Sequence, residues 1–171
     1  MPARRSSRYR RMMNVTVLAV GKLKERYLTD GCREYEKRLG AFCKLNLVEL
    51  PEHRLPDNPS AAEIQNGIER EGDMILAKIP TGSTAVALCI EGRQLSSEEL
   101  AAQIEKLGIA GNSSLCFIIG GSWGLSGRVK ERCALRLSMS RMTFPHQLAR
   151  LLLLEQLYRA FSILNHSKYH K

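Results

Sequence analysis

The sequence is poor in aromatic residues and has no long apolar run. Aromatic side chains make up 6% of the 171 residues and include a single tryptophan, although 44% of the residues are apolar and 25% are charged. This balance is typical of a globular protein. The strongest apolar stretch, residues 151–154, is far shorter than the roughly 20 residues that a membrane span needs. We therefore expect no transmembrane segment.

Cysteines at metal-binding or redox spacing are also missing. The five cysteines are odd in number, and no two of them form a C-x-x-C pair. This pattern argues against a zinc site and against a disulfide framework. We therefore expect reduced, structural thiols, a cytoplasmic location and no metal.

The N-terminal residues 1–12 contain five arginines, no acidic residue and little apolar character. They lack the apolar core of a secretory signal. We interpret them as a disordered basic tail before a single domain over residues 13–171. Without the five arginines of the tail, the net charge of +9 falls to +4, which permits contact with a polyanion but does not prove it.

Strand-like and helix-like segments alternate along the rest of the chain. Apolar, often β-branched runs predict buried strands, and apolar residues at helical spacing predict helices. Ser60 is a predicted N-cap, and Ser96 with Glu99 is a predicted capping box. We expect an α/β fold, with a mainly parallel sheet flanked by helices. The expected strands are 15–20, 45–50, 84–90, 115–119 and 135–140, and the expected helices are 24–39, 60–79, 96–108, 128–133 and 146–165.

The last predicted helix is unusually apolar. On a helical wheel its polar residues, such as Glu155 and Arg159, fall on one narrow face and leave an apolar arc of about 200°. Part of this arc would pack on the sheet and part on a second subunit, giving a homodimer. Alternatively, the helix lies at the centre of a monomer.

Two loops are candidates for a ligand site. Gly120, Gly121 and Gly124 directly follow a buried strand, and ligands of open α/β sheets bind at the carboxyl ends of strands. The spacing is neither a dinucleotide fingerprint nor a phosphate loop, and Gly21 after the first strand has no further glycines, which disfavours a nucleotide-binding oxidoreductase. A plain tight turn explains these glycines equally well.

The second loop carries apolar side chains between hydroxyls and a proline. Residues 138–146 include Met142 and Phe144, which could form the wall of a site for a flat aromatic ligand. Before any family resemblance is considered, packing of these side chains under the last helix is the slightly favoured interpretation. Arg150, in the apolar arc, is either a snorkelling side chain or a ligand for a phosphate or a base carbonyl.

Four motifs together resemble a known family. They are residues 117–125 (Phe-Ile-Ile-Gly-Gly-Ser-Trp-Gly-Leu), 140–147 (Ser-Arg-Met-Thr-Phe-Pro-His-Gln), 155–160 (Glu-Gln-Leu-Tyr-Arg-Ala) and the closing Tyr169-His170-Lys171. The chain resembles the SPOUT-class bacterial methyltransferases that modify a pseudouridine of 23S ribosomal RNA. The resemblance runs from about Met13 to Lys171 and is most specific in the C-terminal half.

The resemblance implies a homodimer with a C-terminal trefoil knot, a rare exception to unknotted topology. It also implies S-adenosylmethionine as methyl donor and methylation at N3 of the pseudouridine within the large subunit or the assembled ribosome. The donor-binding residues carried over from the family are Leu88, Gly120, Met139, Ser140, Arg141, Met142, Thr143 and Phe144.

By the same resemblance, Tyr169 and His170 reach toward the RNA or toward the site of the neighbouring subunit. A uracil-type imino nitrogen has a pKa roughly two to three units above neutral, so a base or a nearby cation must favour its anion. The expected catalytic residues are His170 as proton acceptor, Tyr169, and Arg150 or Lys171 as the cation. Two alternatives remain: a related knotted methyltransferase of transfer RNA or of another ribosomal site, and a non-catalytic ribosome-associated RNA-binding domain.

Overall fold

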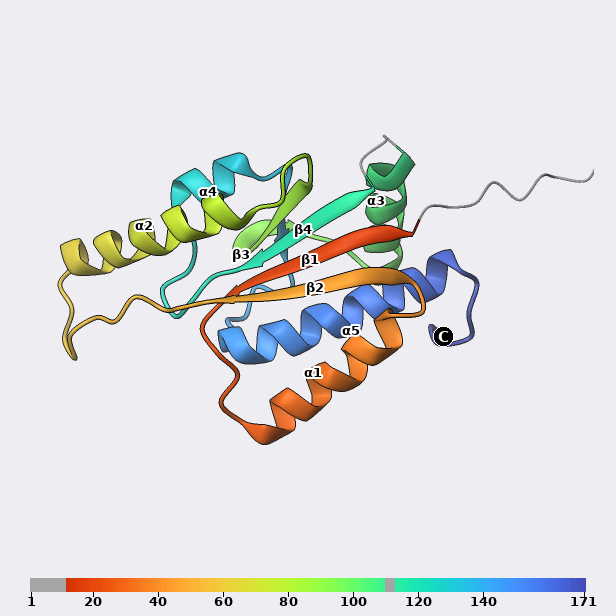
Figure 1. Ribbon diagram of the computed structural model, residues 1–171, viewed down its shortest axis with the longest axis horizontal. Coiled ribbons are helices and arrows are strands. Elements are labelled where there is room, and N and C mark those ends of the chain that lie inside the picture. Colours follow the sequence, from red (N-terminus) through yellow and green to blue (C-terminus); the bar gives the residue numbers. More distant parts are fainter. Residues whose placement is uncertain (1–11, 110–112) are drawn as a thin grey trace, which may run out of the picture.

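The structure, a computed structural model, describes residues 12–109 and 113–171, so the basic tail expected over residues 1–12 lies almost wholly outside the described residues. Five strands form one fully parallel sheet in the order β2-β1-β4-β3-β5 (Figure 1). The elements, in chain order, are β1 (Met13–Val20), α1 (Arg26–Leu39), β2 (Cys43–Leu50), α2 (Ala61–Lys78), β3 (Thr84–Gln94), α3 (Ser97–Ile109), β4 (Ser114–Ile119), α4 (Gly127–Arg132), β5 (Leu135–Ser138) and α5 (His146–Leu164). The predicted α/β fold and its sequence of elements are confirmed.

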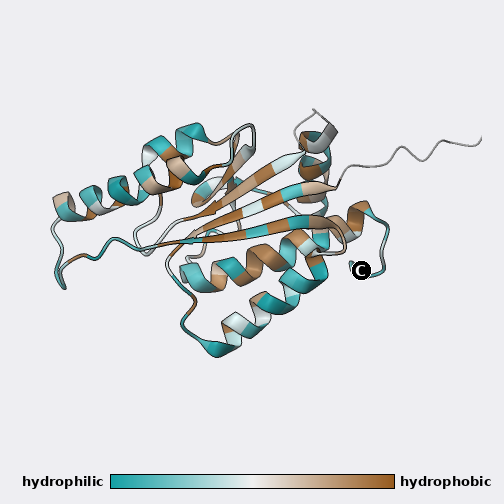
Figure 2. Ribbon diagram, in the orientation of Figure 1, coloured by the Kyte–Doolittle hydropathy of each residue, from teal (hydrophilic) through white to brown (hydrophobic). Residues whose placement is uncertain are grey.

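Helices cover both faces of the sheet. Val15 and Val17 of β1 belong to the apolar core under α1, α3 and α5, whereas Leu18 and Val20 belong to the core under α2 and α4. Because both faces are buried, the central strand β4 is almost wholly apolar, whereas the edge strand β2 also carries polar residues, as Figure 2 shows. None of the helices that the structure describes is long and apolar enough to cross a membrane.

Both predicted serine caps are present. The Ser60 hydroxyl accepts from the N–H of Glu63 at 3.1 Å, and the Glu63 carboxylate accepts from the N–H of Ser60 at the same distance. Ser96 and Glu99 form the same reciprocal pair, with distances of 3.1 and 3.4 Å. These caps satisfy N–H groups that have no partner within the helix, and so fix the beginnings of α2 and α3.

The wide apolar arc of α5 is covered to a large extent within the chain. Every residue of α5 is buried or half-buried, because the helix lies on the sheet between α1 and α3. Leu153, Leu154 and Leu157 are completely buried. The apolar arc by itself therefore does not require a second subunit. The alternative, a helix at the centre of one chain, explains how most of the arc is buried.

β3 differs from its prediction as a straight strand over residues 84–90. It continues to Gln94, but residues 89–92 bulge out, so that Leu88 and Arg93 both pair with Leu137 of β5. The backbone of Gly92 lies so close to Arg136 that an added Cβ would be 2.8 Å from its carbonyl carbon. Glycine at this position allows the bulge, and the bulge places residues 89–91 beside the carboxyl ends of β4 and β5.

Candidate functional site

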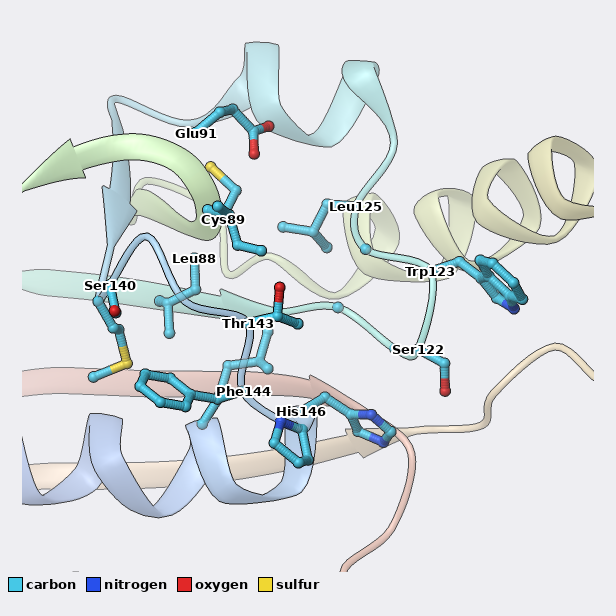
Figure 3. Close-up of a pocket in the computed structure, with 18 of the residues that line it drawn as sticks. Leu88, Cys89, Glu91, Ser122, Trp123, Leu125, Ser140, Thr143, Phe144 and His146 are labelled. Carbon is cyan, nitrogen blue, oxygen red and sulfur yellow. The ribbon is translucent and has the colours of Figure 1, made fainter.

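A cavity of about 860 Å³ opens at the carboxyl ends of β3, β4 and β5 (Figure 3). Its walls come from the β3 bulge, the glycine loop after β4, the loop between β5 and α5, and the first turn of α5. This volume lies within the usual range of small-molecule sites. The lining residues are Leu88, Cys89, Ile90, Glu91, Ile119, Gly120, Gly121, Ser122, Trp123, Gly124, Leu125, Lys130, Leu137, Met139, Ser140, Met142, Thr143, Phe144, Pro145, His146 and Ala149.

The glycine loop is tightly closed. Gly121 and Gly124 form an antiparallel bridge, and the N–H of Gly124 donates to the carbonyl of Gly121 at 3.1 Å. Gly124 has φ +87°, a conformation that favours glycine. A Cβ on Gly120 would lie 2.8 Å from the carbonyl carbon and oxygen of Gly124. Gly120 therefore allows two stretches of backbone to touch at the cavity wall.

Glu52, just after β2, holds this loop in place. Its Oε1 accepts from the hydroxyl of Ser122 at 2.9 Å and from the N–H of Ser122 at 3.3 Å. Partial burial alone would raise the pKa of the Glu52 carboxyl. The two bonds from Ser122, with the nearby charges of His146 and Lys24, instead hold that pKa below its usual value. The carboxylate therefore stays ionised as the acceptor of both bonds.

A second carboxyl group lies behind the loop. Glu71 of α2 is only 6% exposed, and its Oε2 accepts from the N–H of His53 at 2.9 Å. A Cβ added to Gly121 would lie within 3.4 Å of both Glu52 Oε1 and Glu71 Oε1. Burial, with repulsion from Glu52, raises the pKa of Glu71. Sequence reasoning missed both glutamates, because their partners are 70 and 18 residues away along the chain.

The loop between β5 and α5 is shaped by its own hydroxyls. The Ser138 hydroxyl donates to the carbonyl of Ser140 at 3.0 Å, and the Ser140 hydroxyl accepts from the N–H of Met142 at 3.0 Å. Phe144 is half-buried, whereas Met142 is 74% exposed. Of the eight expected donor-binding residues, seven line the cavity; Arg141 is exposed and does not.

Arg150 does not line the cavity. Its side chain is 4% exposed, with Nη1 donating to Glu49 Oε2 at 2.6 Å and Nη2 donating to the carbonyl of Gly21 at 3.0 Å. Its Nε is buried without a partner. The guanidinium thus joins the carboxyl ends of β1 and β2 to the first half of α5.

Tyr169 and His170 lie away from the cavity of their own chain. The C-terminus folds back beside the second half of α5 (Figure 1). His170 contacts Arg159 through Nδ1 at 3.1 Å and Glu98 through Nε2 at 2.7 Å. Arg159 is 13 residues beyond His146 at the cavity, which corresponds to about 20 Å along the helix. One chain therefore does not bring the expected catalytic and donor-binding residues together.

Tyr169 is held in an aromatic and ionic cluster. Its ring packs edge-on against Tyr158 at 4.6 Å and lies 4.8 Å from the Arg159 guanidinium carbon. Its hydroxyl shares a hydrogen bond with that of Tyr35 and donates to Glu155. The Tyr35 bond, burial and the Glu155 charge raise the pKa of Tyr169 to about 12, so its hydroxyl stays protonated at neutral pH. The terminal residues are therefore ordered against α5.

No described part of the chain offers a metal site, since no group of three or more His, Cys, Asp or Glu side chains could hold an ion there. The cavity is instead mainly apolar, and its polar groups are backbone amides, hydroxyls and the side chains of Glu91, Lys130 and His146. Such a lining suits an organic ligand that has a flat apolar part and polar ends.

Comparison with known proteins identifies the family of this chain. The family described as "Predicted SPOUT methyltransferase" matches residues 13–170. Ribosomal RNA large subunit methyltransferase H of Clostridioides difficile (strain 630) is 53% identical over 93% of this chain and 100% of the relative. The protein of the same name from Pelotomaculum thermopropionicum is 51% identical over 93% and 99%.

A solved structure shares the fold. The crystal structure of a "Probable Methyltransferase" from Bordetella pertussis Tohama I covers 86% of this chain and 95% of its own, with a TM-score of 0.51 at 18% identity. Family membership also implies the C-terminal trefoil knot expected from the sequence. Because the family match spans almost the whole described chain and the relatives exceed half identity, this chain belongs to the SPOUT methyltransferases.

Proposed function

We propose that this chain transfers a methyl group from S-adenosylmethionine to N3 of a pseudouridine in 23S ribosomal RNA of the large subunit, acting in the cytoplasm. The observation that carries the proposal is the cavity walled by the glycine loop and by residues 139–144. The names of the relatives, which specify large-subunit ribosomal RNA, support the substrate class. The single functional unit is residues 13–171.

The residues present fit S-adenosylmethionine. The apolar side chains at the cavity suit its adenine ring, and the backbone of Gly120 with the hydroxyls of Ser140 and Thr143 suits its polar groups. Arg141, exposed beside this wall, suits the carboxylate end. The donor is held by Leu88, Gly120, Met139, Ser140, Arg141, Met142, Thr143 and Phe144.

When bound, the donor supplies a methyl group on a sulfonium, which an in-line attack by nitrogen transfers with the electron pair of the broken bond remaining on sulfur. For N3 to attack, the protein must first remove the N3 proton. In the described contacts Arg159 is an obligate donor, so His170 Nδ1 accepts and Nε2 donates to Glu98. His170 takes the N3 proton at Nδ1 once RNA displaces Arg159, while Nε2 continues to donate to Glu98 and the carboxylate stabilises the imidazolium.

The remaining catalytic groups follow from their surroundings. Tyr169 presents its ring and a neutral hydroxyl to the RNA. Lys171 stabilises the base anion, because the Nη atoms of Arg150 are bonded to Glu49 and Gly21. Arg150 acts indirectly, by fixing the strand ends and the start of α5 beside the donor.

The chain acts as a homodimer. About 20 Å of helix separates the tail from the cavity of its own chain, so Tyr169 and His170 serve the cavity of the neighbouring subunit. The half-buried Leu148 and Leu152 on the outer side of α5 supply apolar surface for the dimer contact.

Mass spectrometry of 23S ribosomal RNA, from cells with and without the gene, tests the proposal. Loss of one N3-methylpseudouridine, restored by purified protein with S-adenosylmethionine and large subunits or ribosomes, is the expected result. Methylation of transfer RNA or of another ribosomal position would replace the proposed substrate. Absence of heat on titration with S-adenosylmethionine would favour a non-catalytic RNA-binding domain.

A further inference from the structure

Exposed apolar side chains gather at the mouth of the cavity. Five large apolar residues are exposed among the described ones, and three of them, Ile90 (49%), Trp123 (54%) and Met142 (74%), line this cavity. Ile90 comes from the β3 bulge, Trp123 from the glycine loop and Met142 from the loop between β5 and α5. Water-exposed apolar groups that cluster in this way mark a surface that another molecule covers. We call these three residues the apolar rim.

Trp123, the one tryptophan of the chain, is fixed but uncovered. It lies between Ser122, which donates twice to Glu52, and the bridged Gly124. In Figure 3 its ring stands at the edge of the cavity and points away from Leu88 and Thr143. The ring is therefore placed to meet a molecule outside the donor cavity.

Two cationic residues lie at the same edge as the rim. Arg141 directly precedes Met142 and is exposed, and the N–H of Lys24 donates to Gln147 at the start of α5, which places Lys24 at the same edge. Neither side chain forms a salt bridge with any described residue, whereas Lys130 inside the lining is paired with Glu91. An exposed indole ring and apolar side chains beside two cations without a salt bridge to any described residue match an unstacked base and its phosphates.

Under the proposed function a second copy of the chain brings only its C-terminal tail to this cavity, and a direct contact between two rims fits less well. Facing rims would bring Lys24 and Arg141 of two positively charged molecules toward each other, which opposes association. A nucleic acid supplies both the missing negative charge and the flat apolar groups.

Resting on the proposed function, we infer that the apolar rim binds an unpaired nucleotide adjacent to the methylated one, with its base stacked on Trp123 and its phosphate near Lys24. The rim thus determines which exposed RNA loop is accepted, while the donor cavity determines the chemistry. Stacking needs only a π-face, so the rim recognises an unpaired base without specifying its identity.

The test compares Trp123→Ala, Trp123→Phe and, as a matched control, Tyr27→Ala, which removes a 70% exposed ring of α1. For each variant we would measure the KM for the ribosomal substrate, the calorimetric affinity for S-adenosylmethionine and the oligomeric state. Trp123→Ala should raise the KM about 5- to 100-fold with donor affinity unchanged. Trp123→Phe should restore most of the loss, and Tyr27→Ala should behave as the parent.

Salt dependence tests the phosphate contact. Lys24→Gln should lower the slope of log KM against log salt by about 0.7. An unchanged KM in Trp123→Ala overturns the inference, as does a change of oligomeric state in that variant, which would assign the rim to a second copy. If the parent protein neither binds S-adenosylmethionine nor methylates ribosomes, the proposed function itself has failed.

Discussion

One oxygen of Glu52 accepts both the backbone N–H and the hydroxyl of Ser122, joining the loop after β2 to the glycine loop. This contact holds a wall of the donor cavity from outside the cavity. Hydrogen bonds to a charged acceptor contribute about 1 kcal/mol or more. Glu52→Ala should therefore weaken S-adenosylmethionine binding about fivefold with a smaller effect on kcat.

Ser122→Ala, which keeps only the backbone bond, should show part of this loss, and the double variant should not add the two losses, because both act on one contact. Isothermal titration calorimetry gives the affinities. Fully additive losses would show that Glu52 acts elsewhere.

Glu71 gives a prediction for pH. Its pKa is raised above 4.5 in the folded protein, so ionisation is harder there than in the unfolded chain. Stability is lost as pH rises above about 4.5, and the loss is complete above the raised pKa. Glu71→Gln keeps an oxygen for the His53 N–H and should make the protein more stable at pH 7 but not at pH 4. Urea unfolding at both pH values measures the free energy of unfolding of the variant and the parent. An equal difference between the two proteins at pH 4 and pH 7 would show that burial does not destabilise the ionised Glu71 carboxylate.

Gly120 should not tolerate a side chain. An alanine Cβ would lie 2.8 Å from the backbone of Gly124, so the loop must open at the donor wall. Gly120→Ala should lower donor affinity at least tenfold, as calorimetry would measure. Gly127→Ala is the control, because no atom lies within 4 Å of its added Cβ. Similar affinities for the two variants would remove the glycine loop from the donor site.

Local patterns predicted the elements well, since strand burial, helical spacing and the caps at Ser60 and Ser96 all depend on residues close in sequence. The bulge of β3 was missed, because Gly92 has meaning only against the backbone of Arg136 from another strand. The same limit applies to the site. The glycine loop and the loop between β5 and α5 could be predicted as cavity walls. The Glu52–Ser122 contact could not, because only the fold brings together these two residues, which are 70 positions apart in the sequence.

The burial of Arg150 could not be seen in the sequence either. The sequence allows two interpretations of a charged residue in an apolar arc. Only the contacts with Glu49 and Gly21 show which groups accept the hydrogen bonds of the Arg150 guanidinium. Removing it would leave the buried carbonyl of Gly21 without its donor and the partly exposed Glu49 without its ion-pair partner.

Arg150→Met should therefore destabilise the protein by about 2 kcal/mol, since Glu49 is partly exposed and can be rehydrated when its partner is lost. Arg150→Lys should retain part of the stability. Arg26→Met, at a 95% exposed side chain that pairs with Asp30 on the surface, should change the free energy of unfolding by less than about 0.5 kcal/mol. Urea denaturation compares them. A stable Arg150→Met protein with lost turnover would instead give Arg150 a direct part in the chemistry.

The distance between the tail and the cavity predicts a specific pattern of complementation. His170→Ala alone should keep donor affinity and lose turnover, because it removes the proton acceptor but leaves the cavity intact. Gly120→Ala alone should lower donor affinity at least tenfold and should therefore lose turnover at a limiting concentration of S-adenosylmethionine. If each tail serves the neighbouring cavity, a heterodimer of the two variants contains one complete site, formed by the cavity of the first and the tail of the second.

Equal amounts of the two inactive proteins, co-refolded from urea, should then recover about one quarter of the parent activity, since half of the randomly formed dimers are heterodimers with one working site each. The measurement is methyl incorporation into ribosomes before and after mixing. The control is the double variant His170→Ala/Gly120→Ala mixed with the parent, which forms no complete site in a heterodimer under this arrangement. No recovery in the first mixture, with heterodimers demonstrated by native mass spectrometry, would place tail and cavity in the same chain and require the tail to leave Arg159 and Glu98 to reach it.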